Sequence, residues 1–155
     1  MAQAALGKDN SVWQKIRTDL VNFGKLSGLF TDINVHRFGK KDIDPFEIMV
    51  NVHGMARNLV DVGYGVSQIL PIVYQLSDPD TYGAYLLQQP EVHLHPRAQA
   101  ALGSLIVQAV ARAKRRPYVL IETHSDYLAD LMTPLIFDWK ITWTSLAVTL
   151  QRAAC

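Results

Sequence analysis

Residues 84–96 read AYLLQQPEVHLHP, and residues 118–126 read YVLIETHSD. Each stretch opens with a short apolar run and continues into polar residues, which is typical of a strand that ends at a loop. The run AYLL lies between Gly83 and Pro90, and the run YVLI follows Pro117. We expect each run to form a fully buried strand of a parallel sheet.

A helix is expected between these strands, beginning at Pro96, which is a favourable residue in the first helical turn. Its apolar stripe at helical spacing consists of Ala98, Ala101, Leu102, Leu105, Ile106, Ala109, Val110 and Ala113. The end of this helix is basic, at Arg112, Lys114, Arg115 and Arg116. Cations there complement the helix dipole, so we assign them no function, although a nucleic-acid patch is the alternative. Ser125 is expected to cap a further helix over residues 126–132.

The first part of the chain predicts a different arrangement. Ser11 and Gln14 have capping-box spacing, and an amphipathic helix is expected from there to Gly28, with its apolar positions at Val12, Ile16, Leu20 and Phe23. Alternating residues predict two strands, at 33–35 and 46–53, joined through residues 39–45. A helix containing Pro71 is expected beyond Gly65.

Composition indicates one globular domain with a sizeable core, because the chain has 155 residues of which 49% are hydrophobic. The formal net charge of +1 gives no overall electrostatic case for nucleic acid or an acidic membrane. The single cysteine, Cys155, excludes an internal disulfide framework and a cysteine-based metal site. Without a leader or a membrane-length apolar run, we expect a soluble protein of the cytoplasm.

Polar residues mark the ends of both predicted strands: Gln88 and Gln89 at one, and 122–124 (Glu-Thr-His) at the other. Ligands of parallel α/β sheets usually bind beyond such carboxyl ends. A third stretch, DVGYGVSQ at residues 61–68, places two glycines at the start of a predicted helix with free amide groups, which suits an anion. The alternative is that these glycines only open an ordinary helix.

Taken in order, the stretches 61–68, 86–96 and 121–126 resemble the signature, Walker B plus D-loop, and switch-histidine segments of ABC-type ATPase heads. The resemblance is strongest to prokaryotic AAA-type ATPases related to the SMC, recombination-repair and overcoming-lysogenization-defect groups, and it covers roughly residues 60–132. It implies an α/β fold that is part of a P-loop NTPase. The C-terminal lobe would occupy residues 61–135, after a helix and β-hairpin region at 1–60 and before an uninformative tail at 136–155.

The resemblance also implies roles for individual residues. The signature positions would contact the γ-phosphate of ATP held by a partner subunit; they are Gly63, Gly65, Ser67 and Gln68. His124 would bond the γ-phosphate or the attacking water. The D-loop, which in the family crosses the dimer interface, would include His93, His95 and Pro96.

One departure from the family concerns the end of the first strand. Similar ATPases place an acid at the position of Gln88, where it organises the Mg²⁺ shell, and often another at Gln89, where it polarises the attacking water. A glutamine amide can orient water, but it brings no negative charge to Mg²⁺ and is no general base near neutral pH. Glu91 or Glu122 could supply the missing carboxylate. Alternatively, Glu91 simply begins a loop and Glu122 meets solvent or an arginine.

A phosphate-binding GxxxxGK[ST] loop is absent from the sequence. The string GKLS at 24–27 ends a predicted helix and lacks the upstream glycine, so we reject it as a P-loop. We therefore expect a fragment, a truncated product or one half of a split ATPase, which would need a P-loop-bearing N-terminal lobe and a second head to use ATP and Mg²⁺.

Two alternatives differ in class from this ATPase interpretation. A degenerate, non-enzymatic interaction or regulatory module would explain both glutamines and the missing P-loop. A zinc hydrolase would use His93, His95, His124 and Asp126. The resembling groups serve DNA repair, plasmid maintenance and phage defence, and the residues do not choose among these or decide whether nucleic acid is a partner.

Overall fold

A computed structural model describes residues 10–39, 43–78, 83–114, 117–132, 139–144 and 147–152, with side chains up to residue 130. Part of the predicted 39–45 connection, the basic residues Arg115 and Arg116, and Cys155 lie outside the described residues. The chain forms two compact units, Met1–Ser77 and Asp78–Cys155.

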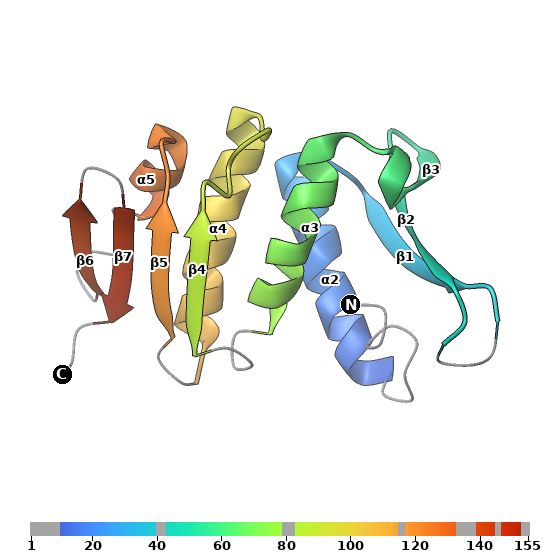
Figure 1. The fold of residues 1–155 in the computed structure, drawn as a ribbon, viewed down its shortest axis with the longest axis horizontal. Coiled ribbons are helices and arrows are strands. Elements are labelled where there is room, and N and C mark those ends of the chain that lie inside the picture. Colours follow the sequence, from blue (N-terminus) through green and yellow to red (C-terminus); the bar gives the residue numbers. More distant parts are fainter. Residues whose placement is uncertain are drawn as a thin grey trace. The chain divides into compact units, whose positions relative to one another are not determined.

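The first unit combines two helices with a small antiparallel sheet (Figure 1). Its elements are α2 (Asn10–Ser27), β1 (Asp32–Arg37), β2 (Phe46–Val52), β3 (Met55–Asn58), the 3-10 helix η1 (Leu59–Asp61) and α3 (Tyr64–Ser77). The strand order is β1-β2-β3, and α2 packs against α3 and β1. The predicted helices and the two predicted strands are confirmed, whereas β3 and η1 were not predicted.

Helix α2 buries an apolar stripe that differs from the prediction at its first turn. Ile16, Leu20 and Phe23 are buried as expected, but Trp13 takes the place predicted for Val12, which is 44% exposed. Ser11 lies inside the helix and is not its cap. The side chain of Arg17 ties α2 to β1, because it donates to the Ile33 carbonyl oxygen at 2.9 Å and pairs with the Asp32 carboxylate.

The end of α2 shows why glycine occupies position 24. A Cβ atom there would lie 2.5 Å from the ring of Phe30 and 2.6 Å from its carbonyl oxygen. The Gly24 carbonyl oxygen also accepts the backbone N–H groups of Leu29 and Phe30. The GK pair at 24–25 therefore has a structural explanation in the turn that follows α2.

Helix α3 begins at Tyr64, three residues before the predicted start at Ser67. Pro71 lies in its interior and is exposed, and the helix continues past it to Ser77. Burial of the apolar residues on one side favours this continuity over a break at the proline. Those buried residues are Val66, Ile69, Leu70, Val73 and Leu76.

The second unit has the predicted alternation of strands and helices. Its elements are β4 (Ala84–Gln88), α4 (Pro96–Arg112), β5 (Tyr118–Glu122), α5 (Asp126–Met132), β6 (Trp139–Thr144) and β7 (Ala147–Arg152). The sheet order is β4-β5-β7-β6, with β4 and β5 parallel and the other neighbours antiparallel. The tail beyond residue 136, for which no structure was predicted, contributes β6 and β7. No described helix is long and apolar enough to span a membrane.

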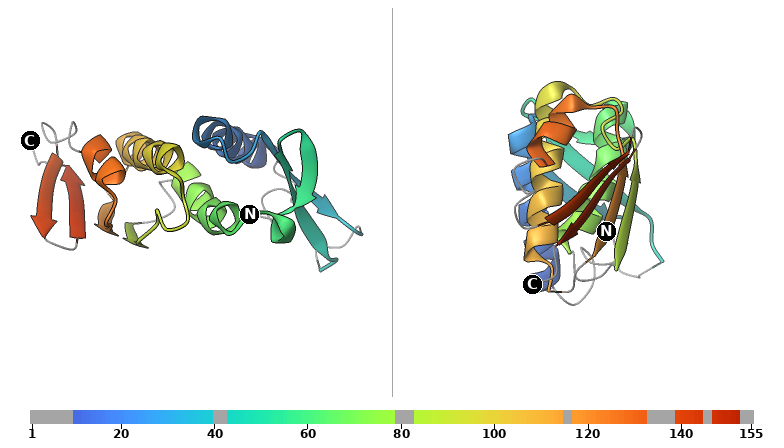
Figure 2. Two further views of the ribbon diagram at one scale, coloured as in Figure 1. Left: turned by 90° about the horizontal axis from the view of Figure 1, so that it is seen from above. Right: turned by 90° about the vertical axis from the view of Figure 1, so that its left-hand side faces the viewer.

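The prediction that β4 and β5 are buried on both faces is wrong. Tyr85 and Leu87 are buried, whereas Leu86 between them is 77% exposed. Strand side chains alternate between faces, and within this unit α4 and α5 lie on one face of β4 and β5 (Figure 2). We define the open sheet face as the exposed residues of the opposite face: Ala84, Leu86, Tyr118 and Leu120.

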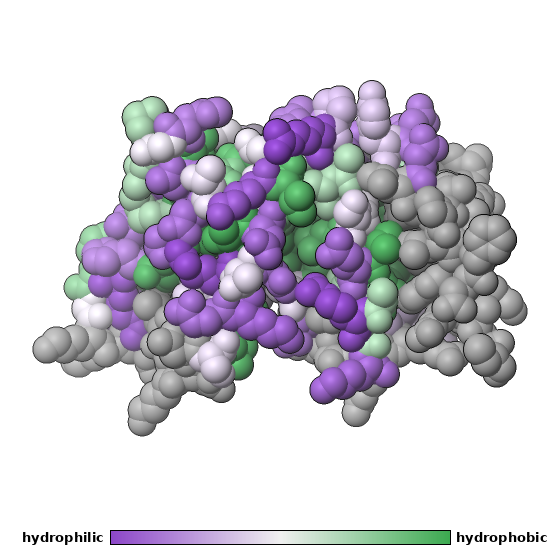
Figure 3. All heavy atoms as spheres, turned by 180° about the vertical axis from the view of Figure 1, so that it is seen from behind, coloured by the Kyte–Doolittle hydropathy of each residue, from purple (hydrophilic) through white to green (hydrophobic). Residues whose placement is uncertain are grey.

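The open sheet face contrasts with the surface seen from behind. On the side shown in Figure 3, hydrophilic residues cover most of the described surface and apolar residues appear between them. On β4 and β5, by comparison, Leu86, Tyr118 and Leu120 stand exposed next to one another in register, because Leu86 pairs with Leu120 and Ala84 with Tyr118. These side chains form a contiguous exposed apolar patch.

Candidate functional site

The carboxyl ends of β4 and β5 meet as the sequence predicted. Gln88 pairs in register with Glu122, and the Gln89 N–H donates to the Glu122 carbonyl oxygen at 2.8 Å. Gln89 has a positive φ of 44°, so the chain turns sharply where the strand ends. Gln88 is exposed, and the side chains of Gln89 and Glu122 are half-buried. The two polar strand ends therefore form one edge.

The loop between β4 and α4 folds back on itself. The Val92 N–H donates to the Gln89 carbonyl oxygen at 3.1 Å, and the Leu94 N–H donates to that of Glu91 at 3.0 Å. His93 adopts a positive φ of 66° within this turn. His95 then precedes α4 without a side-chain cap, and Pro96 opens the helix, as predicted.

Glu91 lies inside this loop and not at its surface. The residue is only 7% exposed, and its Oε1 accepts the backbone N–H of His124 at 2.9 Å. Its Oε2 is buried without a hydrogen-bond partner. The Glu91 side chain thus links the loop after β4 to the segment after β5. The alternative in which Glu91 simply begins a loop is not supported.

A second side chain, Gln99 in the first turn of α4, joins the same two segments. Its Nε2 donates to the Leu94 carbonyl oxygen at 2.8 Å, and its Oε1 accepts the Ser125 hydroxyl at 2.5 Å. Ser125 Oγ in turn accepts the Leu128 N–H at 3.2 Å, which confirms the predicted cap of α5. Gln99 was not predicted as a site residue, although the sequence shows it as a lone amide in the apolar first turns of α4.

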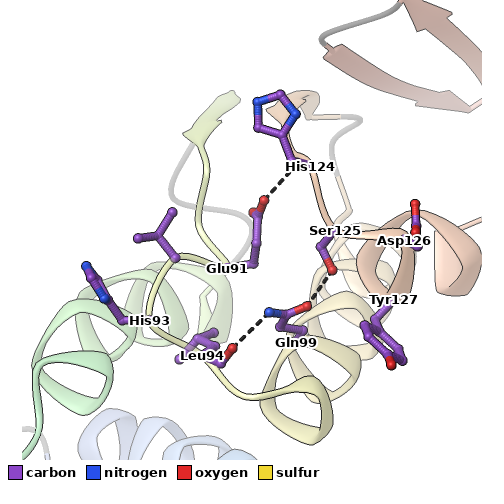
Figure 4. Close-up of a pocket in the computed structure, with 9 residues that line it drawn as sticks. Glu91, His93, Leu94, Gln99, His124, Ser125, Asp126 and Tyr127 are labelled. Carbon is purple, nitrogen blue, oxygen red and sulfur yellow. Dashed lines mark hydrogen bonds between the residues drawn. The ribbon is translucent and has the colours of Figure 1, made fainter.

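These contacts border an open pocket of about 370 Å³ (Figure 4). Its lining comes from the loop after β4, from α4 and from the segment after β5; the residues are Glu91, Val92, His93, Leu94, Gln99, His124, Ser125, Asp126 and Tyr127. Figure 4 shows Glu91 reaching toward the backbone of His124, while the imidazole of His124 extends away from it. The ring of His124 is exposed and its backbone is held.

The predicted zinc alternative is not supported. Within the parts of the chain that the structure describes, no three His, Cys, Asp or Glu side chains come close enough to hold a metal ion. His93 and His124 lie at separate places on the rim of the pocket in Figure 4. His93, His95, His124 and Asp126 therefore do not form a tetrahedral site.

The predicted signature residues belong to the first unit, whereas the residues that line the pocket belong to the second. Gly63 precedes α3, and a Cβ atom there would meet nothing within 4 Å. Ser67 Oγ donates to the Tyr64 carbonyl oxygen at 2.9 Å, and Gln68 Nε2 donates to the Tyr64 hydroxyl at 3.1 Å. Because α3 starts at Tyr64, Gly65 and Ser67 lie in its first turn, where the Val66 N–H donates to the Gly63 carbonyl oxygen at 2.9 Å.

The described residues fit the phosphate groups of ATP better than they fit Mg²⁺. The N-terminus of α3 beside an uncrowded Gly63 fits a phosphate group. Mg²⁺ prefers carboxylate oxygens, whereas Gln88 offers a neutral amide and the Glu91 carboxylate is buried. Glu122, which is half-buried and pairs in register with Gln88, adds one carboxylate at this edge, so the described residues there do not by themselves complete a Mg²⁺ shell.

Comparisons with solved structures identify the fold. The chain aligns with the Smc head domain of Pyrococcus furiosus, which has an extended coiled coil and is bound to the C-terminal domain of ScpA, at 13% identity and a TM-score of 0.60, over 90% of this chain and 35% of that one. A SmcHead bound to the C-winged helix domain of ScpA aligns at 14% identity and 0.62, over 90% and 43%.

A third match comes from work on ATP-driven dimerization and DNA stimulated activation of SMC ATPases. It aligns at 11% identity and a TM-score of 0.55, over 92% of this chain and 85% of that chain. At these identities the matches establish the fold, which is that of a lobe of an ABC-type ATPase head, a P-loop NTPase fold. The chain spans only about a third to two fifths of the first two structures' length.

No curated protein matches the sequence. A family model does: the one described as "AAA domain, putative AbiEii toxin, Type IV TA system" matches residues 9–130. That range includes α2 through most of α5, and with it every predicted site residue. The chain therefore belongs to this AAA-domain family.

Proposed function

We propose that the chain is the C-terminal part of an ATP-binding ABC-type ATPase head, which acts with a P-loop-bearing lobe and with a second head. The observation that carries this proposal is the edge where β4 and β5 end together, with Gln88 and Gln89 beside Glu122 and with His124 tied to the next loop. Family membership and the head fold supply the context in which this edge faces a nucleotide.

Each site residue has a role in this proposal that its exposure allows. His124 presents a free ring edge to the γ-phosphate or the attacking water, since its ring is exposed. Gly63 and the first turn of α3 contact the γ-phosphate of ATP held by the other head, because no side chain crowds Gly63. Gly65, Ser67 and Gln68 complete this signature surface.

The open sheet face supports the need for another lobe. Leu86 and Tyr118 are 77% and 62% exposed on strands whose opposite face is fully packed. In addition, β4 pairs only with β5 in the described sheet, so one edge of β4 is available for a further strand. A lobe that carries the P-loop would cover this face and extend this edge, with residues 61–135 of this chain as its counterpart.

We expect this head to hydrolyse ATP slowly, even where it binds ATP well. ATP brings Mg²⁺ to the assembled head, and the chemistry that Mg²⁺ supplies is neutralisation of the phosphate charge. On the side of this chain, Gln88 contributes only an amide oxygen, and Gln89 can orient a water molecule without removing its proton. We therefore propose a head that binds and clamps ATP more effectively than it hydrolyses it.

A test of the proposal combines this chain with the P-loop-bearing lobe encoded in frame with it or beside it. Association and turnover are measured during an ATP titration, with and without Mg²⁺, by analytical ultracentrifugation and phosphate release. We expect ATP to drive association of two assembled heads, with slow turnover. Association that is equal with and without ATP, and no turnover, would contradict the proposal.

A second candidate is a non-enzymatic interaction or regulatory module that kept the lobe and lost the chemistry. The amides at Gln88 and Gln89 together with the buried Glu91 favour it, because no exposed carboxylate stands at the end of β4. This module would bind its partner with the same affinity in the presence and absence of ATP.

A further inference from the structure

Two side chains join the loop after β4 to the segment after β5, and neither is part of the phosphate-facing surface proposed above. Glu91 holds the backbone N–H of His124 at 2.9 Å, and Gln99 connects the Leu94 carbonyl oxygen with the Ser125 hydroxyl. The bonds to His124 and Ser125 join residues 33 and 26 positions apart in the sequence, and the bond to Leu94 spans five positions. We propose that Glu91 and Gln99 are positioning residues that set where His124 stands relative to the loop 91–95.

The donors and acceptors around Gln99 allow only one orientation of its amide. The Leu94 carbonyl oxygen can only accept, so Gln99 must present its NH₂ group to it. Its carbonyl oxygen then faces Ser125, whose hydroxyl donates to it while accepting the Leu128 N–H. The bonds thus run in one direction from the start of α5 through α4 to the loop, and hydrogen bonds in such a chain polarise one another.

Glu91 reaches His124 from the other side of the same segment. Its Oε1 accepts the His124 N–H, while burial of the carboxylate keeps water from competing for that donor. His124 is therefore fixed through its own backbone and through its neighbour Ser125, and its ring stays free. A shift of the loop 91–95 at a dimer interface would move both anchors, and with them the ring.

This inference rests on the proposed function for the role of His124, but the tether itself exists in the isolated chain. Its first test is therefore hydrogen exchange of the His124 amide, followed by NMR in this chain without nucleotide. Glu91→Ala should speed exchange of that amide by about threefold to tenfold, the effect of one lost hydrogen bond. Glu91→Gln keeps an acceptor oxygen and should retain most of the protection.

Gln99→Leu tests the second anchor without touching Glu91. It preserves size and removes both bonds, and we expect faster exchange at residues 124–128. Gln108→Leu is the matched control, because it makes the same change at an exposed position of the same helix and should leave exchange at His124 unchanged. Thermal unfolding of each variant shows whether the fold persists. Unchanged exchange at His124 in folded Glu91→Ala and Gln99→Leu would overturn the tether.

A second readout uses the chain assembled with its P-loop lobe. As a positioning residue, Gln99 affects kcat and leaves KM for ATP nearly unchanged, so Gln99→Leu should lower kcat about tenfold or more. Glu91→Gln should recover turnover relative to Glu91→Ala. If Glu91→Gln instead loses turnover as fully as alanine while His124 stays protected, Glu91 acts in the chemistry and the positioning role is wrong. If no variant or parent binds ATP, the proposed function fails while the exchange data still decide the tether.

Discussion

At the scale of single residues, glycine has different structural roles at two positions of this chain. Glycine at position 24 is required by packing, because Phe30 occupies the space that a side chain would need. Glycine at position 63 has no such neighbour. Only the second glycine is open to an approach from outside, so an added methyl group should destabilise the chain at position 24 and have little effect at position 63.

Gly24→Ala should lower the free energy of unfolding by about 1–3 kcal/mol, since the new methyl group clashes with the Phe30 ring and carbonyl oxygen. This cost exceeds the gain of up to about 1 kcal/mol that alanine brings to a helix. Gly63→Ala, the control, should change stability by less than about 0.5 kcal/mol. Urea unfolding measures both, and equal stabilities for the two variants would contradict the packing role of Gly24.

Gln88 and Gln89 lead to a gain-of-function prediction. In the assembled head, the double substitution Gln88→Asp and Gln89→Glu should raise Mg²⁺-dependent ATP turnover about 100-fold or more, because it supplies a charge for the metal and a general base. Phosphate release at several Mg²⁺ concentrations checks this. Gln108→Glu adds charge on an exposed part of α4 and controls for it. Continued ATP binding with unchanged turnover would count against these positions.

At the scale of elements, helix boundaries and continuity depend on the cap and on the buried stripe. Ser125 caps α5 through the Leu128 N–H, as its sequence position indicates. Helix α3 continues across Pro71, although the proline ring lacks the N–H that would bond the Ser67 carbonyl oxygen. The buried stripe of α3 compensates for that lost bond.

Pro71→Ala should therefore stabilise the chain by about 1–3 kcal/mol, since it restores the helical hydrogen bond and removes the ring at an exposed position. Pro96→Ala is the matched control, because a proline at the first position of α4 blocks no helical bond and its replacement should change stability by less than about 0.5 kcal/mol. Thermal unfolding distinguishes them. A destabilised Pro71→Ala chain would mean that the proline shapes α3.

At the scale of the whole molecule, the open sheet face shows that the packing of this chain is one-sided. Leu86 is 77% exposed, whereas Leu87 next to it is buried under the helices of its own unit. Two adjacent leucines of one strand therefore have different surroundings. Leu87 contributes to the core of the chain, and we expect the exposed Leu86 to contact the proposed partner lobe.

Leu86→Lys should leave the unfolding of the chain nearly unchanged and weaken its association with the P-loop lobe at least tenfold, because a charge would be buried on docking. Ile43→Lys makes the same type of change at a residue that is 88% exposed in the β1–β2 connection, and it should not affect that association. Calorimetric titration of the lobe measures both. Equal affinities for the two variants would remove the open sheet face from the proposed interface.

The sequence by itself predicted the four helices, the strands β1, β2, β4 and β5, the parallel pairing of β4 with β5, and the place where polar residues gather, but it did not predict β3, η1, β6 or β7. The predicted features follow from local information: the period of apolar residues, the prolines and the serine cap. It also predicted that Gln88, Glu122 and His124 lie at one edge, because parallel strands end together. The ATPase-head fold followed from the three motif segments.

Only the tertiary structure decided which faces are covered and which polar groups meet. An apolar strand such as AYLL looks the same whether one face or both are packed, because burial depends on elements elsewhere in the chain or in another chain. Likewise, the bonds of Glu91 to His124 and of Gln99 to Ser125 join residues 33 and 26 positions apart. Local patterns carry no record of such pairs, since these contacts form when the chain folds.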